Sequence, residues 1–355
     1  MRIAHLTWSM GIGGIQTMLV GIVNGQIQEG HEVGIFVVDT YVSETIVNKL
    51  DPQVKVFYMG RTRGTKPIWP FIKLNWQLWK YKPDIIHSHA GKLSKVLLTN
   101  VPMIATIHSM NNNPNDYKKY KKCYAISEAV KKDFEEKGVD NVIVIENGIP
   151  CGEITPKKDF RINDTIHVVQ VSRIVFSPKR QDLVVQALAE VKAYLKDHEK
   201  IRGKRVLVHF VGDGLDLAKL KSLVSDLKLE KDVMFEGFKD RNWVYEHLCD
   251  FDLFLQPSDH EGFGLTVAEA CAAKLPVLVS DVDGPLEVID NGRLGMVFRH
   301  GDAGDLKDQL IKFLVDGYNY QLIEPAYQNT LQKYDVKRTT ARYLEEYAKV
   351  VGIKQ

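Results

Sequence analysis

Short apolar segments that alternate with helical stretches are the feature that most constrains the fold of this chain. Strand-like runs of the kind buried in a parallel sheet recur in the first half, at 3–7, 33–38, 54–58, 84–87, 103–107, 122–126 and 142–145. Helical stretches lie between most of them, and the first runs from Ile15 to about Glu29, where Gly30 ends it. This alternation predicts a doubly wound parallel sheet.

The same alternation restarts after a polar stretch, residues 147–164, that contains several glycines and prolines. Strand-like runs of this second half lie at 167–171, 206–211, 233–235, 253–255, 277–279 and 296–298. The chain of 355 residues is about twice as long as a typical domain. The sequence therefore predicts an α/β protein with two Rossmann-like domains, residues 1–164 and 165–334, that face each other across a cleft. In such sheets ligands bind beyond the carboxyl ends of the strands.

Charge and hydropathy limit the partners. The net charge is +2, which argues against a nucleic-acid partner. Residues 51–122 nevertheless contain 13 Lys and Arg against 3 acidic residues, which predicts an electropositive face towards an anionic partner or membrane surface. No apolar run approaches the roughly 18 residues that cross a bilayer, and Met1 leads directly into a strand without a signal peptide. The cysteines are scattered, as in a reducing compartment. We expect a cytoplasmic protein, at most peripheral at the inner face of the membrane.

An aromatic and basic stretch at residues 69–81 allows two interpretations. It has the composition of a helix that lies on a membrane surface. Its apolar positions are equally those of a helix packed on a sheet, and we favour this core interpretation, with part of the rim left to meet lipid. The positions assigned to the core are Phe71, Ile72, Leu74, Leu78 and Trp79.

The segment 258–270, with the sequence SDHEGFGLTVAEA, carries the most specific chemistry. Gly262 and Gly264 predict a tight turn, and the following residues have the spacing of a helix. The unpaired N–H groups at the start of this helix attract an anion such as a phosphate. Glu261 precedes the helix, and Glu269 lies in its second turn. A nucleotide-sugar would fit, with its phosphates on the N–H groups and its hydroxyls on the carboxylates. Two solvated glutamates remain the alternative.

A basic loop follows the first strand of the second half. Arg173 and Lys179 lie on it, just before the helix that begins near Gln181. Two fixed cations beside a helix start could neutralise a diphosphate as it departs. Taken alone, the segment is equally well explained as a solvated basic loop.

The first half has two weaker candidate sites. Its glycine-rich loop begins at Gly11, but Gln16 stands where a dinucleotide fingerprint needs glycine, which disfavours nicotinamide binding. His87, His89 and His108 follow or end two successive strands, where they could hydrogen-bond sugar hydroxyls. A metal site built from these three histidines has no supporting carboxylate, and His108 is the favoured functional residue.

Together these motifs resemble the family 4 retaining glycosyltransferases of the GT-B fold, over essentially the whole chain. The most specific element is the pair Glu261 and Glu269, separated by seven residues. The supporting motifs, in chain order, are Gly11–Gly14, K-P-D-I-I-H-S-H at 82–89, His108, Ser127, Asn147–Gly148, Arg173 with Lys179, V-G-D-G at 211–214 and the turn at 284–287.

The resemblance implies roles for individual residues in the second domain. It implies that Arg173 and Lys179 bind the donor diphosphate, that Glu269 binds the ribose hydroxyls and that Glu261 binds the hydroxyls of the donor sugar. The backbone N–H groups that would lie near the donor belong to Phe263, Gly264 and Leu265.

It also implies roles for the first domain. Gly13 and Gly14 would approach the phosphate or the acceptor, and His108 would touch the transferred sugar. A C-terminal helix at about 335–355 would pack back on this domain. The sequence departs from the family pattern at Gln16, where an acidic residue is common, and at Arg180, where glycine is usual.

The function that the resemblance implies is transfer of a sugar, with retention, from a nucleoside-diphosphate-sugar to a hydroxyl acceptor. UDP is the commonest nucleotide in the family. The acceptor would be a saccharide or a lipid-linked molecule, in bacterial surface polysaccharide or glycolipid synthesis. No D-x-D motif stands in a position suited to the donor, so no metal and no other cofactor is expected. The alternatives are a GT-B enzyme that hydrolyses, phosphorylyses or epimerises a nucleotide-sugar, and a non-catalytic nucleotide-sugar-binding module.

Overall fold

The chain forms two compact units in a computed structural model that describes residues 1–110, 112–198 and 203–353. The first unit comprises Met1–Pro150 and Lys333–Gln355, and the second comprises Cys151–Gln332. The division after Pro150 lies fourteen residues before the boundary at 164 that the sequence suggests. Residues 354–355 of the expected C-terminal helix and residues 199–202 of the expected second domain lie outside the described residues.

The first unit is built on a seven-stranded parallel sheet with the strand order β3-β2-β1-β4-β5-β6-β7. Its strands are β1 (Arg2–Thr7), β2 (Glu32–Asp39), β3 (Lys55–Arg61), β4 (Ile85–Ser88), β5 (Met103–Ile107), β6 (Lys122–Ala125) and β7 (Val142–Val144). The helices of this unit are α1 (Gly14–Gln28), α2 (Glu44–Val47), α3 (Trp69–Tyr81), α4 (Glu128–Glu136) and α13 (Val336–Val351). The order reverses direction beside β1, as in a doubly wound sheet.

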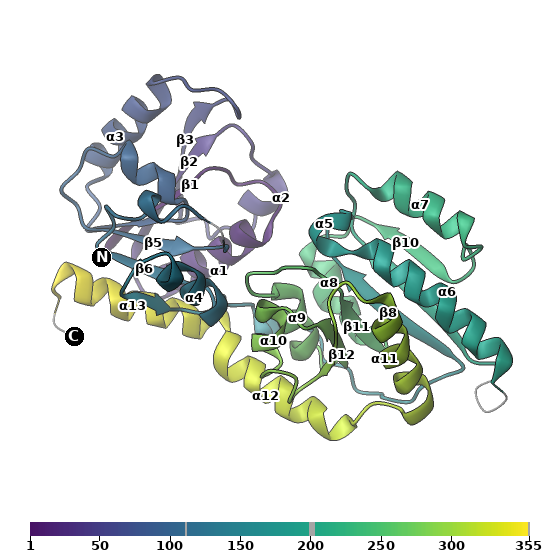
Figure 1. Cartoon of the computed structure of the whole chain (residues 1–355). Coiled ribbons are helices and arrows are strands. Elements are labelled where there is room, and N and C mark those ends of the chain that lie inside the picture. Colours follow the sequence, from purple (N-terminus) through teal and green to yellow (C-terminus); the bar gives the residue numbers. More distant parts are fainter. Residues whose placement is uncertain (111, 199–202, 354–355) are drawn as a thin grey trace. The chain divides into compact units, whose positions relative to one another are not determined.

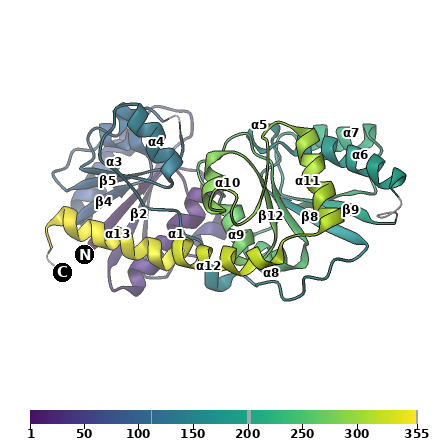
Figure 2. The same cartoon turned by 60° about the horizontal axis from the view of Figure 1, so that its bottom comes forward.

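Alternate residues of β1 show how the two faces of this sheet are covered. Leu6 packs in a cluster with Leu74 and Leu78 of α3. Ile3, on the opposite face, packs with Tyr343 and Tyr347 of the C-terminal helix α13. Figure 1 shows α3 on one side of the sheet, and α1 and α13 on the other. In both Figure 1 and Figure 2, α13 runs alongside α1, so the end of the chain is part of the first unit.

The core interpretation of α3 is correct on one side of the helix and wrong on the other. Leu74 and Leu78 are buried, and Phe71 packs against them. Ile72 and Trp79 were assigned to the core, but they are 50% and 71% exposed. Because α3 carries apolar residues around most of its circumference, its sequence does not reveal which side faces the sheet.

The second unit contains a six-stranded parallel sheet with the strand order β10-β9-β8-β11-β12-β13. Its strands are β8 (Thr165–Val171), β9 (Arg205–Val211), β10 (Val233–Gly237), β11 (Leu253–Gln256), β12 (Val277–Ser280) and β13 (Met296–Phe298). Its helices are α5 (Phe176–Lys179), α6 (Gln181–Asp197), α7 (Leu217–Asp226), α8 (Arg241–His247), α9 (Leu265–Ala272), α10 (Asp283–Val288), α11 (Ala303–Asp316) and α12 (Ile323–Tyr334). Each sheet follows the predicted alternation of strands and helices.

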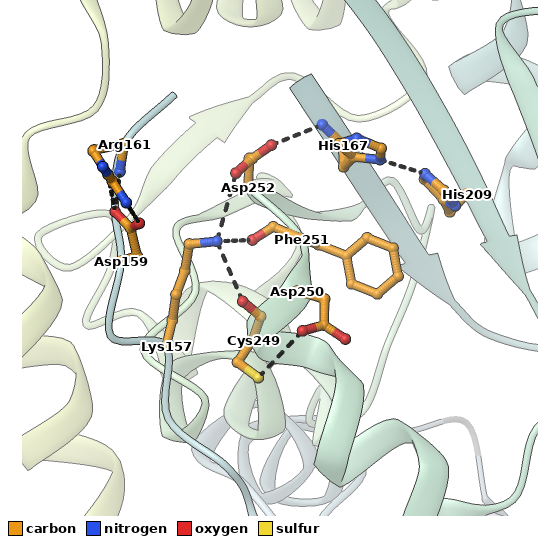
Figure 3. A network of polar contacts seen from close by, with 9 residues as sticks. All are labelled: Lys157, Asp159, Arg161, His167, His209, Cys249, Asp250, Phe251 and Asp252. Carbon is orange, nitrogen blue, oxygen red and sulfur yellow. Dashed lines mark hydrogen bonds and ion pairs between the residues drawn. The ribbon is translucent and has the colours of Figure 1, made fainter. Parts of the chain in front are cut away.

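A polar network ties the start of the second unit to its sheet, as Figure 3 shows. Lys157 Nζ donates hydrogen bonds to the carbonyl oxygens of Phe251 (2.7 Å) and Cys249 (3.2 Å) and lies 3.5 Å from Asp252 Oδ1. Asp252 Oδ2 accepts the N–H of His167 at 2.9 Å. These contacts lie at the amino ends of β8 and β11 and fix residues that the sequence assigns to an interdomain linker.

Within the described residues, none of the helices combines the length and the apolar character that crossing a bilayer requires.

Candidate active site

The turn between β11 and α9 forms the centre of the candidate site. Gly264 precedes the first residue of α9 and has φ of 101° in the left-handed region, which a residue with a side chain adopts only at a cost. Phe263 is buried and anchors the turn. The backbone N–H groups that begin α9 are therefore held in place at the carboxyl end of β11. This is the geometry that the E-G-F-G sequence predicts.

Lys179 and Glu261 are brought together although 82 positions separate them in the sequence. Lys179 Nζ and Glu261 Oε2 form an ion pair, and both side chains are partly exposed, at 17% and 24%. Gln256 Nε2, at the end of β11, lies 3.4 Å from the same carboxylate oxygen. A cation and a carboxylate thus meet beside the start of α9, within reach of solvent.

Further contacts join the basic loop to the α9 turn. Asp259 N donates a hydrogen bond to Pro178 O at 2.9 Å, and Arg180 Nη1 donates to Asp259 Oδ1 at 2.9 Å. Arg180, which stands where the family usually has glycine, has φ of 51°. Its ion pairs with Asp182 and Asp259 offset the cost of this left-handed conformation. The basic loop is therefore a fixed part of the site.

Arg173 lies on the same loop with its side chain exposed. Two buried glutamines hold the backbone on either side of it. Gln181 Nε2 donates to Arg173 O, and Gln170 Nε2 donates to Lys179 O, both at 2.8 Å. Sequence reasoning missed both glutamines, because a single glutamine in a strand or at a helix start has no distinctive pattern.

The V-G-D-G motif at residues 211–214 packs closely against the loop that carries Arg173. A Cβ atom added at Gly212 would overlap the carbonyl oxygen of Ser172, and one added at Gly214 would overlap that of Ile174. Ile174 N also donates a hydrogen bond to Asp213 O at 2.9 Å. The glycines are thus required by close contact with the loop that carries Arg173, and not only by a turn.

Glu269 is almost completely buried, and its partner is Arg241 at the start of α8. Arg241 Nη1 donates to Glu269 Oε1 at 2.6 Å and also contacts Oε2. Burial raises the pKa of Glu269, and the positive charge of Arg241 opposes this rise. A buried carboxylate requires such a partner, but nothing in the sequence around Arg241 identifies it.

His108 of the first unit belongs to a chain of hydrogen-bonded histidines. His108 Nε2 lies 3.1 Å from His89 Nδ1, and His89 Nε2 lies 3.0 Å from His5 Nδ1. His5 Nε2 in turn lies 2.8 Å from Gln26 Oε1. Burial lowers the pKa of His5 to about 4 and that of His108 to about 3. The imidazoles are therefore neutral near pH 7.

Gln26 sets the direction of the hydrogen bonds in this chain. Its Oε1 is an acceptor, so His5 carries its proton on Nε2 and accepts at Nδ1. His89 then donates from Nε2, and His108 donates from its own Nε2 to His89 Nδ1. This arrangement leaves His108 Nδ1 as an acceptor, which suits a hydroxyl donor.

One group of side chains could hold a metal ion within the part of the chain that the structure describes. Ring nitrogens of His5, His87 and His89 lie within 4.8 Å of one another. Each histidine already makes hydrogen bonds, and His87 binds the hydroxyls of Thr106 (Nε2, 2.7 Å) and Tyr347. Metal binding would have to break this network, so the geometry favours the hydrogen-bonded arrangement.

The remaining predicted residues lie where α1 begins. Gly13 precedes the helix, Gly14 is its first residue, and Gln16 Nε2 donates to Ser9 O at 3.3 Å. The roles predicted for the two glycines stay predictions, as do those of Phe263 and the other donor-site residues.

Comparison with known families decides what kind of protein this is. A model described as Glycosyltransferase Family 4 matches residues 12–153, and one described as Glycosyl transferases group 1 matches residues 153–329. The chain belongs to the family 4 glycosyltransferases. The family that the sequence motifs suggest is thus confirmed. The two matched ranges together span nearly all of this chain.

Two relatives show how far the similarity extends. This glycosyltransferase is 30% identical over 200 residues to the N-acetyl-alpha-D-glucosaminyl L-malate synthase of Bacillus anthracis, covering 55% of this chain and 49% of the relative. It is 26% identical over 208 residues to the poly(ribitol-phosphate) alpha-N-acetylglucosaminyltransferase of Staphylococcus aureus, covering 58% and 39%. The chain spans about half the length, or less, of these relatives.

A solved structure shows the fold. The crystal structure of Anabaena HepE in complex with UDP and glucose resembles this glycosyltransferase with a TM-score of 0.81 at 18% identity, covering 98% of this chain and 99% of HepE. The predicted GT-B fold class, with two parallel α/β sheets, is confirmed.

Proposed function

We propose that this glycosyltransferase moves a sugar from a UDP-sugar to a hydroxyl acceptor, with retention at the anomeric carbon. The observation that carries the proposal is the junction of the basic loop with the α9 turn, where Lys179 meets Glu261 beside the first N–H groups of the helix. Cations, a helix start and an accessible carboxylate suit a ligand with both a diphosphate and hydroxyls.

The charged groups would act on the leaving diphosphate. Arg173 and Lys179 neutralise the phosphates, and the N–H groups of Gly264 and Leu265 point at the charge that develops as the bond to the sugar breaks. Because these donors are already held in position, little reorganisation is needed during the reaction. The departing phosphate accepts the proton of the acceptor hydroxyl, which attacks from the same face.

The carboxylates and the histidine would orient the sugars. Glu261 accepts hydrogen bonds from hydroxyls of the donor sugar. Arg241 donates a hydrogen bond to the Glu269 carboxylate. The remaining lone pairs of this carboxylate accept hydrogen bonds from the ribose hydroxyls. His108 accepts a hydroxyl of the transferred sugar at Nδ1. The mechanism uses no metal.

The names of the relatives support the substrate class. Two of them transfer N-acetylglucosamine, one to L-malate and one to poly(ribitol-phosphate), and HepE binds UDP and glucose. We therefore propose UDP-N-acetylglucosamine or UDP-glucose as the donor, and a saccharide or lipid-linked acceptor in surface polysaccharide or glycolipid synthesis at the inner face of the membrane.

The test is release of UDP from labelled UDP-sugars, with and without a panel of hydroxyl acceptors. Transfer predicts UDP release that depends on the acceptor and a labelled product with retained configuration. Free sugar formed at the same rate without acceptor would identify a hydrolase, and an altered sugar would identify an epimerase. Tight UDP-sugar binding without turnover on any acceptor would favour a non-catalytic module. Glu261→Gln is the matched inactive control.

A further inference from the structure

Helix α3 presents apolar side chains on two sides. Successive residues of a helix are rotated by about 100°, which places Leu74 and Leu78 roughly opposite Ile72, Trp76 and Trp79. The first two are buried against the sheet. The other three are 50%, 52% and 71% exposed. The outer side of α3 therefore also carries large apolar side chains.

Neighbouring residues enlarge this surface. Trp69, at the start of α3, is 73% exposed, and Ile68 and Leu98 are 74% and 87% exposed. Asn75 holds Leu98 beside the helix, because its Oδ1 accepts the N–H of Leu98 at 2.7 Å. We call the set the α3 patch. It comprises Ile68, Trp69, Ile72, Trp76, Trp79 and Leu98.

The segment that carries most of the α3 patch is rich in basic residues. Residues 61–83 contain six lysines and arginines and no acidic residue. Lys73 and Lys80 lie on α3 beside the exposed tryptophans, and Lys80 Nζ is 5.2 Å from the ring centroid of Trp76. The ion pair of Arg61 with Asp39 accounts for only one of these six charges. The patch is thus an apolar surface with two lysines beside its tryptophans.

We propose that the α3 patch docks on an anionic lipid bilayer, with its tryptophans at the level of the headgroups. Tryptophan favours this interface because its ring is apolar and its N–H is polar. The lysines beside it would gain from the negative potential of anionic lipids. A helix with an apolar outer side and basic flanks is the kind that lies in the plane of a membrane surface. The inference goes beyond the proposed sugar transfer and can be tested without a donor.

The experiment is co-sedimentation of the full chain with vesicles of phosphatidylcholine alone and of phosphatidylcholine with phosphatidylglycerol. We expect binding to the anionic vesicles only, weakened by salt. The variant W69S/W76S/W79S should lose at least about tenfold in affinity. The matched control L227S/M234S/V315S, which removes exposed apolar residues of the second unit, should bind like the wild type.

A second pair of matched variants tests whether vesicle binding depends on the lysines of α3. Lys73→Glu with Lys80→Glu should abolish binding to anionic vesicles. Lys118→Glu with Lys119→Glu changes the charge of the same unit equally and should preserve it. The proposal is overturned by equal binding to both vesicle types, by no binding, or by a tryptophan variant that binds like the wild type. Self-association that depends on the tryptophans, seen in light scattering, would also overturn it.

Thermal shifts with UDP-sugars separate this proposal from the proposed function. W69S/W76S/W79S should retain the wild-type shift, because the candidate donor site lies in the second unit. A chain that binds vesicles but no UDP-sugar would refute only the proposed sugar transfer. A chain that binds UDP-sugar but no vesicles would refute only the proposed membrane docking of the α3 patch.

Discussion

The two sheets present opposite kinds of chemistry at their carboxyl ends. In the second unit, Lys179 pairs with Glu261, and Arg241 with Glu269, so full charges are held in fixed positions. In the first unit, His89 and His108 are hydrogen-bonded to each other and kept neutral by burial. Fixed cations can neutralise negative charge that develops in a reaction, whereas the neutral histidines offer hydrogen bonds to a hydroxyl. We infer that the second unit handles the departing diphosphate and that the first orients a hydroxyl.

Breaking the buried ion pair should have the largest effect. Arg241→Met leaves the buried Glu269 carboxylate without its cation, which should destabilise the second unit by about 3–5 kcal/mol. Urea unfolding followed by circular dichroism measures the loss. The double variant Arg241→Met with Glu269→Leu should recover much of it, because the uncompensated charge is gone. A double variant no more stable than Arg241→Met would show that the pair is not the cause.

Removing the accessible cation should affect turnover more than stability. Lys179→Met should lower kcat by about 10²–10³, the cost of losing one electrostatic contact to a developing charge. Its stability should change little, since the side chain is partly exposed. Steady-state kinetics with a UDP-sugar measures the effect, and Lys219→Met, an exposed cation on α7, is the control. Unchanged kcat would remove Lys179 from the reaction.

Acid should destabilise the first unit through its histidines. The pKa of His5 is lowered to about 4, so between pH 6.5 and 4 the unfolded chain binds a proton that the folded chain does not. The free energy of unfolding is therefore retained above pH 6.5. Between pH 6.5 and 4 it decreases by up to about 1.4 kcal/mol per pH unit for each such histidine.

Intrinsic fluorescence measures this slope, because Trp8, Trp69, Trp76 and Trp79 all belong to the first unit. His5→Gln should reduce the slope of the unfolding free energy against pH by the contribution of one histidine. A stability independent of pH between 6.5 and 4 would contradict the neutral cluster.

The smallest expected effect concerns the orientation of His108. His89→Leu removes the acceptor of the His108 Nε2 proton and should lower kcat/KM about tenfold, the range of a lost positioning contact. The affinity for UDP should stay unchanged, because no residue of the second unit is altered. Nitrogen NMR of the imidazoles provides a separate test, in which wild-type His108 carries its proton on Nε2. A proton on Nδ1 would contradict the direction assigned to the chain.

The sequence predicts the fold well because buried parallel strands form short, nearly continuous apolar runs. The helices between them show apolar residues at helical spacing. The family resemblance assigns Lys179 and Glu261 to the same donor molecule, and the structure brings the two side chains together. Arg241 could not be found in this way, because its pairing with Glu269 depends on how α8 packs against α9. The exposed side of α3 was misjudged for a related reason. A helix with apolar residues on two sides does not reveal which side is buried.

The central claim is that the α9 turn and the basic loop of the second unit bind the diphosphate of a nucleotide-sugar. Hydrogen exchange of backbone amides with and without UDP tests it directly. The account predicts slower exchange at residues 262–266 and 172–180 when UDP is bound. Saturating UDP that leaves both segments unchanged, while protecting amides elsewhere, would contradict it.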